Sequence, residues 1–442
     1  MTPAERTTIE DMLRRAYADA SATVPDDDFG PGLSSFQPRP PSARSGGPAW
    51  RSRWLIPASA AAAVAIVVLV AALVAPKARQ PGEPVASVPR QMAYVVGAGE
   101  VMPVDIATGV ALRPIKLGVP GGPAGYAVTP DGRTIYVVTF RGYVVPVDTV
   151  TRTAGPAIRI GGVPFGLLIS RDGRTGYVME PPYGVAVVDF TLNRLAGFIR
   201  VDDAASFALT PDGNTLYVAN RTGSTVTPID TASLTPLRPV TTTENMPEFA
   251  RIAMAPDGST AYVEGGVEHG HDFAGAYGVL TPISTATNKA LRPIKLSNAA
   301  ESISFSHDGR TAYLTGSAGV TAIDLASGKI SWTANLPATI GSYEAATSAD
   351  GQIIDLLGVS PIVFRIQAAT GALLAPIRAG TITWNADELA VSPDGKTLYV
   401  QSYTVGPRGA QPTTMISVSA ATGKVGRVIR LAEPGYLLFG PS

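Results

Sequence analysis

The sequence predicts an all-β fold, namely an eight-bladed β-propeller of four-stranded antiparallel blades. Two observations predict it. A turn phrase of the type PDGRTIY recurs seven times at intervals of 40 to 51 residues, and a second phrase of the type VDIATG occurs eight times. Only short strand-like runs lie within each period, which is typical of propeller blades. Seven blades are the alternative, because one unit, ADGQIID at residues 349–355, departs from the pattern.

The first phrase reads as two strands joined by a tight turn. An apolar run precedes it and predicts the inner strand of a blade, and the Tyr-Val run after it predicts the second strand. Proline presets φ, aspartate satisfies the turn backbone and glycine tolerates a positive φ. The turn aspartates are Asp131, Asp172, Asp212, Asp257, Asp308, Asp350 and Asp394.

The ends of the repeat region predict how the ring closes. The first copy of the second phrase, at residues 101–109, has no inner strand ahead of it. The last residues, GYLLFGPS at 435–442, look like an inner strand with nothing after it. Joining the two completes one blade from both ends of the chain and leaves no open sheet edge.

These phrases resemble the YVTN family of β-propeller repeats of bacterial surface and envelope proteins. The likeness is strongest in DGRTIYVV followed by the turn Val-Asp-x-Ala-Thr-Gly, and it covers about residues 92 to 440. The resemblance implies the architecture but no activity, because propellers host binding platforms, lactonases, lyases and dehydrogenases. The best-known YVTN-like propellers have seven blades, so a count of eight departs from the family.

The chain ahead of the repeats divides into four segments. Residues 1–24 carry a helical apolar stripe and predict an amphipathic helix. Through residues 3–20 this helix would bind a cytoplasmic partner or a second copy of the chain; the alternative is a partly ordered tail. Residues 25–54 are rich in Pro, Gly and Ser and predict a flexible linker. Residues 76–91 predict a proline-punctuated spacer.

Residues 55–75 contain no charge over 21 positions and predict a transmembrane helix. A cleaved signal peptide is the rival interpretation, but 54 residues precede the segment and Pro76 follows it, a poor cleavage context. Arginines are concentrated on its N-terminal side, which favours a cytoplasmic N-terminus. We therefore expect a single-pass protein of the cell membrane whose propeller, residues 92–442, is extracytoplasmic.

Composition excludes several classes of function. The 35 basic and 35 acidic residues balance, so no global charge points to a nucleic-acid partner. The absence of cysteine from the sequence removes disulfides, thiolate zinc sites and cysteine nucleophiles. The sequence also lacks a Gly-x-Ser-x-Gly elbow, a phosphate-binding Gly-rich loop and a His-Glu-x-x-His motif. We assign no catalytic residue.

Length variation predicts which face of the ring binds. The turns of one face, Asp-Gly and Ala-Thr-Gly, are short and uniform. The connections of the other face contain all the long insertions, and one-sided insertion is how repeat proteins display a binding surface. The insertions are residues 241–249, 264–277, 379–387 and 402–414.

Charged residues gather at the start of the inner strands on that face. Six or seven positions before the Asp-Gly turns the sequence has Arg251, Glu301, Glu344, Asp387 and Glu388, whereas the earlier units have only Ala, Gly, Phe and Ser there. These residues predict a lopsided ligand or cation site, and converging carboxylates suit calcium. The alternative is a set of acids solvated at a wide channel mouth.

A second candidate site is the loop Glu-His-Gly-His-Asp at residues 268–272. His269, His271 and Asp272 could bind zinc or another transition metal together with nearby carboxylates. The alternative is a solvated loop. His307 is interpreted as a surface turn residue, and the repeated tyrosines, such as Tyr136, as core.

Two functions follow from these observations. The first is a binding or interaction platform for a protein or a small ligand at the insertion-bearing face. The alternative is a metal-dependent propeller hydrolase or lyase, lactonase-like, in which Glu301, Glu344 or Glu388 acts as ligand or base at the channel mouth.

Overall fold

A computed structural model describes residues 92–442 with internal gaps. The gaps are 222–223, 243–250, 268–276, 297–299, 301, 317–318, 337–343, 349, 359–361, 380–384, 404, 407–408, 411–412, 432–434 and 440–442. The predicted amphipathic helix, linker, membrane segment and spacer fall in residues 1–91, outside the described residues. Within the described ranges, no helix has the length and apolar character needed to cross a membrane.

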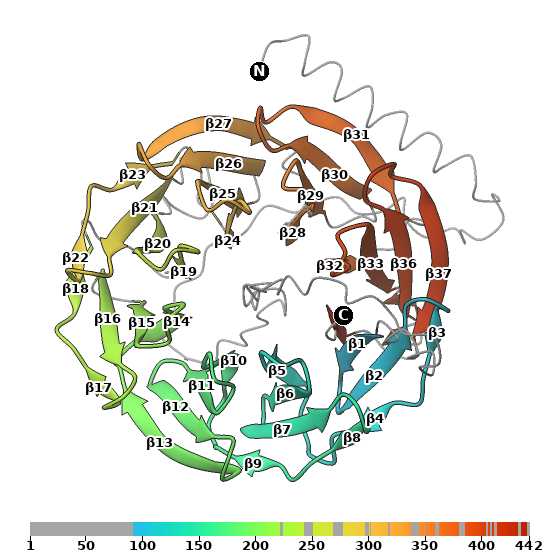
Figure 1. The fold of residues 1–442 in the computed structure, drawn as a ribbon, viewed down its shortest axis with the longest axis horizontal. Helices are drawn as coiled ribbons and strands as arrows, with labels where there is room; N and C mark the ends of the chain where they lie inside the picture. Colours follow the sequence, from blue (N-terminus) through green and yellow to red (C-terminus); the bar gives the residue numbers. More distant parts are fainter. Residues whose placement is uncertain are drawn as a thin grey trace, which may run out of the picture. The chain divides into compact units, whose positions relative to one another are not determined.

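The described strands form a ring of eight blades around a central channel (Figure 1). Every blade is antiparallel and runs outward in strand order from the channel to the circumference. The prediction of an eight-bladed propeller is confirmed, and the seven-bladed alternative is wrong. The irregular unit at residues 349–355 belongs to a complete blade, because its strands pair in the same order as the others.

Blades are numbered here in chain order, and each is given from its inner strand outward. Blade 1 comprises β38 (Gly435–Phe439), β1 (Met92–Gly97), β2 (Glu100–Asp105), β3 (Val110–Ala111) and β4 (Ile115–Lys116). Blade 2 comprises β5 (Pro123–Val128), β6 (Thr134–Thr139), β7 (Tyr143–Asp148), β8 (Thr153–Ala154) and β9 (Ile158–Arg159). Blade 3 comprises β10 (Phe165–Ile169), β11 (Thr175–Glu180), β12 (Gly184–Asp189) and β13 (Arg194–Arg200). Blade 4 comprises β14 (Ala204–Leu209), β15 (Thr215–Asn220), β16 (Thr225–Asp230), β17 (Thr235–Pro236) and β18 (Val240–Thr241).

The second half of the ring repeats this plan. Blade 5 comprises β19 (Arg251–Met254), β20 (Thr260–Val267), β21 (Tyr277–Ser284), β22 (Lys289–Ala290) and β23 (Ile294–Lys295). Blade 6 comprises β24 (Ser302–Phe305), β25 (Thr311–Gly316), β26 (Gly319–Asp324) and β27 (Lys329–Asn335). Blade 7 comprises β28 (Glu344–Thr347), β29 (Ile353–Leu357), β30 (Ile362–Gln367) and β31 (Leu373–Arg378). Blade 8 comprises β32 (Asn385–Val391), β33 (Thr397–Tyr403), β36 (Thr413–Ser419) and β37 (Val425–Leu431), with the hairpin β34 (Val405–Gly406) and β35 (Gly409–Ala410) between β33 and β36.

The C-terminal strand closes the ring, as the sequence predicts. β38 pairs antiparallel with β1, so Leu437 lies opposite Val95 and Leu438 lies opposite Tyr94. The two leucines point to opposite sides of the sheet. Leu437 packs in the cluster between blades 8 and 1, and Leu438 packs in the cluster between blades 1 and 2. β38 therefore contributes to the packing on both sides of blade 1. Each interface between two neighbouring blades is called a joint.

The hydrophobic core lies between blades. In the clusters described here, the members come from two neighbouring blades: Ala208 and Tyr217 of blade 4, for example, pack with Ile252 and Ile283 of blade 5. A blade alone would leave both of its apolar faces in water, so each blade depends on two neighbours. This requirement explains why the repeat continues until the ring is complete.

The Asp-Gly turn is built by its own side chains. The Asp131 carboxylate accepts hydrogen bonds from the Thr129 hydroxyl at 2.6 Å and from the Arg133 N–H at 3.0 Å. Gly132 donates to the Thr129 carbonyl and has a φ of +68°, a region that costs other residues free energy. The equivalent turns use Ser or Thr two residues before Asp172, Asp212, Asp308, Asp350 and Asp394.

The outer strands differ from the prediction of one continuous fourth strand per blade. In blades 1, 2, 4 and 5 the outer strand is two short pieces, separated by a segment that contains Pro114, Pro156, Pro239 or Pro293. Proline has no N–H to give to the ladder, so pairing is interrupted there. Blades 3, 6, 7 and 8 keep a single outer strand.

The repeated tyrosines and His307 lie where the sequence predicts. Tyr136, Tyr177, Tyr217, Tyr262, Tyr313 and Tyr399 are buried between blades, as core residues. His307 is exposed in the turn between β24 and β25.

Candidate functional site

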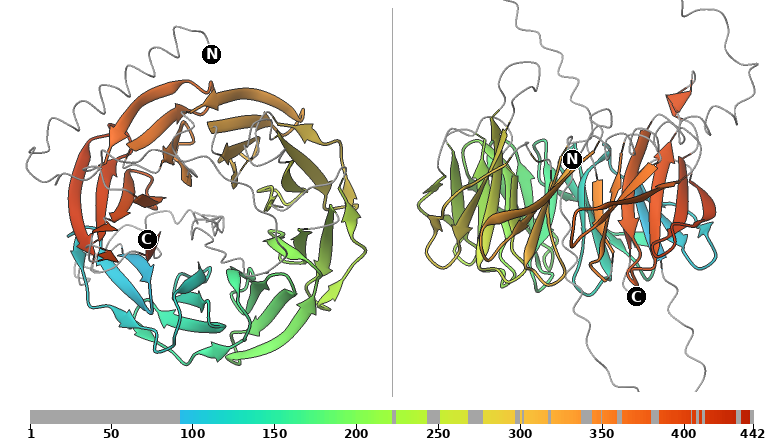
Figure 2. Two further views of the ribbon diagram at one scale, coloured as in Figure 1. Left: turned by 180° about the vertical axis from the view of Figure 1, so that it is seen from behind. Right: turned by 90° about the horizontal axis from the view of Figure 1, so that it is seen from above.

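The two faces of the ring differ, as the loop lengths predict. One face is formed by the compact turns described above. On the other face, β20 and β21 of blade 5 extend to eight residues each, where most second and third strands have six. In blade 8 the hairpin β34–β35 projects from this same face (Figure 2, right). We call it the insertion face.

Arg251 opens the inner strand of blade 5 and binds the connection that leads into blade 6. Its Nη1 donates to the carbonyl of Ala300 at 3.1 Å. Glu264 lies opposite Arg251 in the β19–β20 ladder, and its Oε1 accepts the Ala300 N–H at 2.9 Å. Glu264 is 1% exposed. Arg251 and Glu264 therefore bind the carbonyl and the N–H of Ala300, in the connection that leads into blade 6.

Glu388 lies in the inner strand of blade 8 and binds the last strand of the ring. Its Oε2 accepts the N–H of Leu437 in β38 at 2.5 Å, and the Tyr126 hydroxyl of blade 2 donates to Oε1 at 3.4 Å. The ring of Tyr126 lies 5.4 Å from that of Tyr436. Glu388 is only 5% exposed, so this carboxylate is engaged by the protein and is not solvated.

The same bond recurs at another joint. Ser206 of blade 4 occupies the position of Glu388, six residues before the turn aspartate, and its Oγ accepts the N–H of Ile252 in blade 5 at 3.2 Å. The channel-side edge of an inner strand has backbone donors with no strand partner. Glu388 and Ser206 each satisfy one such donor in the following blade.

Blades 2 and 3 have glycine at this position, for two different reasons. A Cβ on Gly125 would lie 2.6 Å from the Cα of Gly166 in the neighbouring inner strand, so the two backbones approach too closely for a side chain at residue 125. Gly166 itself has a φ of +73°, a left-handed conformation that favours glycine.

The remaining predicted residues are only partly placed. Glu344 opens β28 and Asp387 lies in β32, on inner strands that contact each other, but only their backbone is described. Glu301, His269, His271 and Asp272 lie outside the described residues. In the part of the chain that is described, no three His, Cys, Asp or Glu residues are grouped so as to hold a metal ion.

Sequence reasoning did not single out Glu264 or Glu180, two buried acids on the insertion face. Glu180 ends β11 and is 7% exposed; its Oε1 is buried without a hydrogen-bond partner among the described residues. Burial raises the pKa of Glu180. In blade 4 the equivalent residue is Asn220, whose amide donates to the Asp202 carbonyl at 2.6 Å. The sequence signal that could have identified Glu180 is an acid at a position where the neighbouring repeats have Thr139 and Asn220.

Comparison with known proteins supports the fold alone. No family model matches the chain, and no curated protein matches it. Among solved structures, hydrazine synthase of Kuenenia stuttgartiensis is 19% identical, with a TM-score of 0.50 over 72% of this chain and 98% of its own. Dihydro-heme d1 dehydrogenase NirN, solved in complex with DHE, is 17% identical, with a TM-score of 0.63 over 81% of this chain and 77% of its own. These structural similarities support the β-propeller fold of this chain.

Proposed function

We propose that this protein is a membrane-anchored binding platform whose insertion face binds a protein or a small ligand. The observation that carries the proposal is the difference between the two faces. One face repeats a compact turn, whereas the other bears the lengthened β20–β21 pair and the β34–β35 hairpin. Selection for stability alone favours short, uniform connections, so long segments on one face favour recognition.

The hydrogen bonds made by the described acids favour binding through the loops over catalysis by these acids. Glu388 and Glu264 each accept a backbone N–H of a following strand or connection. A carboxylate used in this way positions the backbone at the channel mouth. It is a poor general base because abstracting a proton would break a buried hydrogen bond.

The second candidate is a propeller hydrolase or lyase that uses calcium or zinc. It is favoured by the positions of Glu344 and Asp387, two acids whose backbone belongs to adjacent inner strands. Both structurally similar proteins are enzymes by name, and one was solved in complex with DHE. At identities of 19% and 17%, this similarity supports a shared fold and does not by itself support a shared activity.

The platform is tested with three forms of the full-length protein in its native membranes. The first is wild type; the second replaces residues 404–412 by Asn-Gly, which joins β33 directly to β36. The third carries Val150→Ser and Leu192→Ser, two exposed residues in turns of the opposite face. After chemical cross-linking, we expect the same partner on the wild type and on the third form but not on the second. Equal capture by all three forms would contradict the proposal.

The metalloenzyme alternative has its own test. Purified full-length protein is analysed for bound calcium and zinc, and its thermal unfolding is compared before and after chelator. Bound metal and a chelator-dependent fall in the melting temperature favour this alternative over the platform. Absence of both removes it.

Membrane anchoring through residues 55–75 is part of the proposal, with a cytoplasmic N-terminus and an extracytoplasmic propeller. Residues 3–20 are proposed to bind a cytoplasmic partner or a second copy of the chain. Extraction of membranes at alkaline pH tests the anchor: the protein should stay in the pellet, and deletion of residues 55–75 should release it. Protease added outside intact cells should digest the propeller and spare residues 1–54.

A further inference from the structure

Neighbouring blades are joined at the circumference by a repeated contact. The turn between the third and fourth strands of each blade contains one residue with positive φ, and this turn faces the preceding blade. At the joint of blades 4 and 5, the Tyr217 hydroxyl donates to Asn288 Oδ1 at 2.5 Å. At the joint of blades 6 and 7, a Cβ on Gly371 would lie 2.6 Å from the Trp332 ring. In both cases a large side chain of the preceding blade fills the joint.

The joint of blades 7 and 8 has neither the tyrosine–asparagine bond nor the tryptophan ring; Ile377 lies there instead, with its Cγ1 2.9 Å from the place that a Cβ on Gly423 would occupy. Blade 7 has Asp355 where other blades have tyrosine, and blade 8 has Gly423 where blade 5 has Asn288. An open pocket of about 320 Å³ lies there at the surface, with Leu374 and Val425 36% and 40% exposed. Its lining residues are Arg365, Leu374, Ala375, Pro376, Ile377, Arg378, Thr422, Gly423 and Val425.

Arg365 provides a buried hydrogen-bond donor at this pocket. Its Nε donates to Asp355 Oδ1 at 2.8 Å, and its Nη2 donates to the carbonyl of Ala420 in blade 8. The side chain is 7% exposed. Among the described residues Nη1 has no hydrogen-bond partner, and it lies 3.9 Å from the place that a Cβ on Gly423 would occupy.

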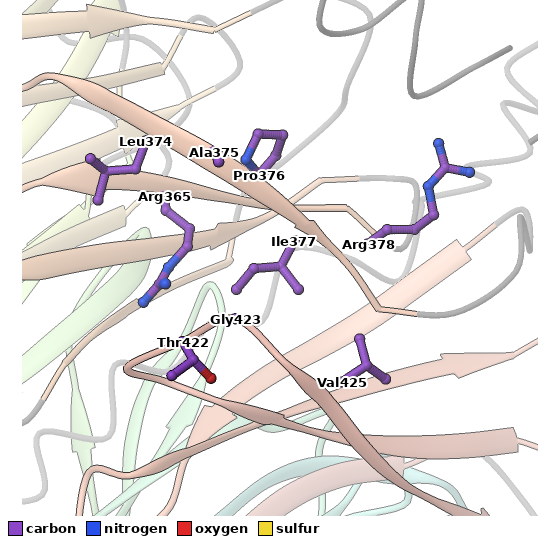
Figure 3. Close-up of a pocket in the computed structure, with 9 residues that line it drawn as sticks. All are labelled: Arg365, Leu374, Ala375, Pro376, Ile377, Arg378, Thr422, Gly423 and Val425. Carbon is purple, nitrogen blue, oxygen red and sulfur yellow. The ribbon is translucent and has the colours of Figure 1, made fainter. Parts of the chain in front are cut away.

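Apart from the polar residue Thr422, the rest of the pocket is apolar or positively charged. Figure 3 shows Arg365 and Ile377 extending from blade 7 toward the turn at Gly423, while Arg378 points away from that turn. Pro376 and Val425 add apolar wall. Arg365 and Arg378 are the charged residues among the nine that line the pocket; Asp355, which pairs with Arg365 Nε, does not line it. The remaining guanidinium donor and the apolar wall favour an anionic group with an apolar body.

We infer that the pocket between blades 7 and 8 binds a carboxylate that bears a short apolar chain. The carboxylate accepts hydrogen bonds from Arg365 Nη1 and from the Thr422 hydroxyl. The chain lies against Ile377, Pro376 and Val425. This site is separate from the insertion face, and it stands or falls without the platform function.

Hexanoate is the probe, and its uncharged isostere hexanamide is the control ligand. Binding to full-length protein is followed by calorimetry and by the methyl NMR signals of Ile377 and Val425. Two variants are compared. Gly423→Asn places a side chain in the pocket at a turn position that Asn193 and Asn288 occupy in other blades, with φ of 49° and 50°. Its Cβ would lie 2.9 Å from Ile377 Cγ1, so the flexible Ile377 side chain must shift to admit it. Gly328→Asn makes the same change at the joint of blades 5 and 6, where the nearest atom to a new Cβ is 3.8 Å away.

We expect saturable hexanoate binding to wild type and to Gly328→Asn, with shifts of the Ile377 and Val425 methyl signals. Gly423→Asn should weaken hexanoate at least tenfold, and hexanamide should bind wild type at least tenfold more weakly. Equal affinity of the two ligands, or unchanged affinity in Gly423→Asn, overturns the inference. If Gly423→Asn does not fold, the wild-type methyl signals decide: no shift with hexanoate overturns it. An acetylated Ala-Ala-Leu peptide with a free carboxylate, compared with its amide, distinguishes a chain terminus from a free small acid.

Discussion

Asp355 and Arg365 lie opposite each other in the β29–β30 ladder, with Arg365 Nε 2.8 Å from Asp355 Oδ1. The other seven blades place a tyrosine at the position of Asp355 and a residue without charge opposite it. Those pairs are Tyr94–Pro103, Tyr136–Pro146, Tyr177–Val187, Tyr217–Pro228, Tyr262–Pro282, Tyr313–Ala322 and Tyr399–Ser417. The ion pair performs the same task as the tyrosine. Tyr94 donates to the Thr149 carbonyl of the next blade, and Arg365 donates to the equivalent carbonyl of Ala420.

Removing one member of this pair should be costly, and removing both should not. Asp355→Ala leaves a buried guanidinium without its counter-charge, which typically costs about 3–5 kcal/mol. Asp355→Tyr combined with Arg365→Ala recreates the Tyr313–Ala322 pair of blade 6, and we expect its free energy of unfolding to lie within about 1 kcal/mol of wild type. Urea unfolding followed by tryptophan fluorescence measures both. A double variant as unstable as Asp355→Ala would contradict the prediction.

The same pair predicts a pH dependence of stability. Burial raises the pKa of Asp355 to about 6, because the partial pairing with Arg365 does not offset desolvation. A carboxyl that holds its proton more tightly when folded stabilises the fold most below about pH 4. That contribution is lost as the pH rises to about 6, and the loss is on the order of 3 kcal/mol. Wild type should lose stability relative to the Asp355→Tyr/Arg365→Ala variant between pH 4 and 6. If the free energy of unfolding changes with pH in parallel for the two proteins, the pH dependence does not come from Asp355.

Protonation of the turn aspartates changes the stability of the fold in the opposite direction, and these residues serve as the internal reference. The Thr129 hydroxyl, followed by the Arg133 N–H, lowers the pKa of Asp131, so its contribution is present above about pH 4 and is lost as the pH falls below it. These aspartates are unchanged in the double variant. The difference between the two unfolding curves therefore isolates Asp355.

Glu388 should matter for ring closure through one amide. Glu388→Ala leaves the buried N–H of Leu437 without its acceptor, which costs about 1–3 kcal/mol. Glu388→Gln keeps an acceptor oxygen and should cost less. Hydrogen exchange of the Leu437 amide is the readout, and protection should fall most in Glu388→Ala. Ser206→Ala is the matched variant at the joint of blades 4 and 5, where the Ile252 amide should respond while Leu437 does not.

The turn glycine should be replaceable by asparagine but not by alanine. Gly132 has a φ of +68°, a conformation that costs residues with a Cβ about 1–2 kcal/mol. Asparagine tolerates this region better, so Gly132→Asn should retain a higher melting temperature than Gly132→Ala. Gly122→Ala is the control, because a Cβ there meets no atom within 4 Å and the backbone is not left-handed. A Gly122→Ala melting temperature as low as that of Gly132→Ala would show that φ is not the cause.

The architecture can be predicted from the amino-acid sequence alone. The turn phrase around residues such as Asp131 and Gly132 is stabilised by neighbours within five residues, so its chemistry is readable locally. Its period then reflects one structural unit, and the unmatched pieces at residues 101–109 and 435–442 indicate that the ring closes in eight blades.

The roles of individual polar side chains, by contrast, depend on how the blades pack against one another. Glu388, Glu264 and Arg365 bond to backbone atoms 49, 36 and 55 residues away, across a joint between blades. Sequence position shows that an acid stands near the channel mouth, but it does not show which unpaired N–H of the next blade it meets. That contact depends on how closely two backbones approach, and in a ring this distance is set by the packing of all the blades together.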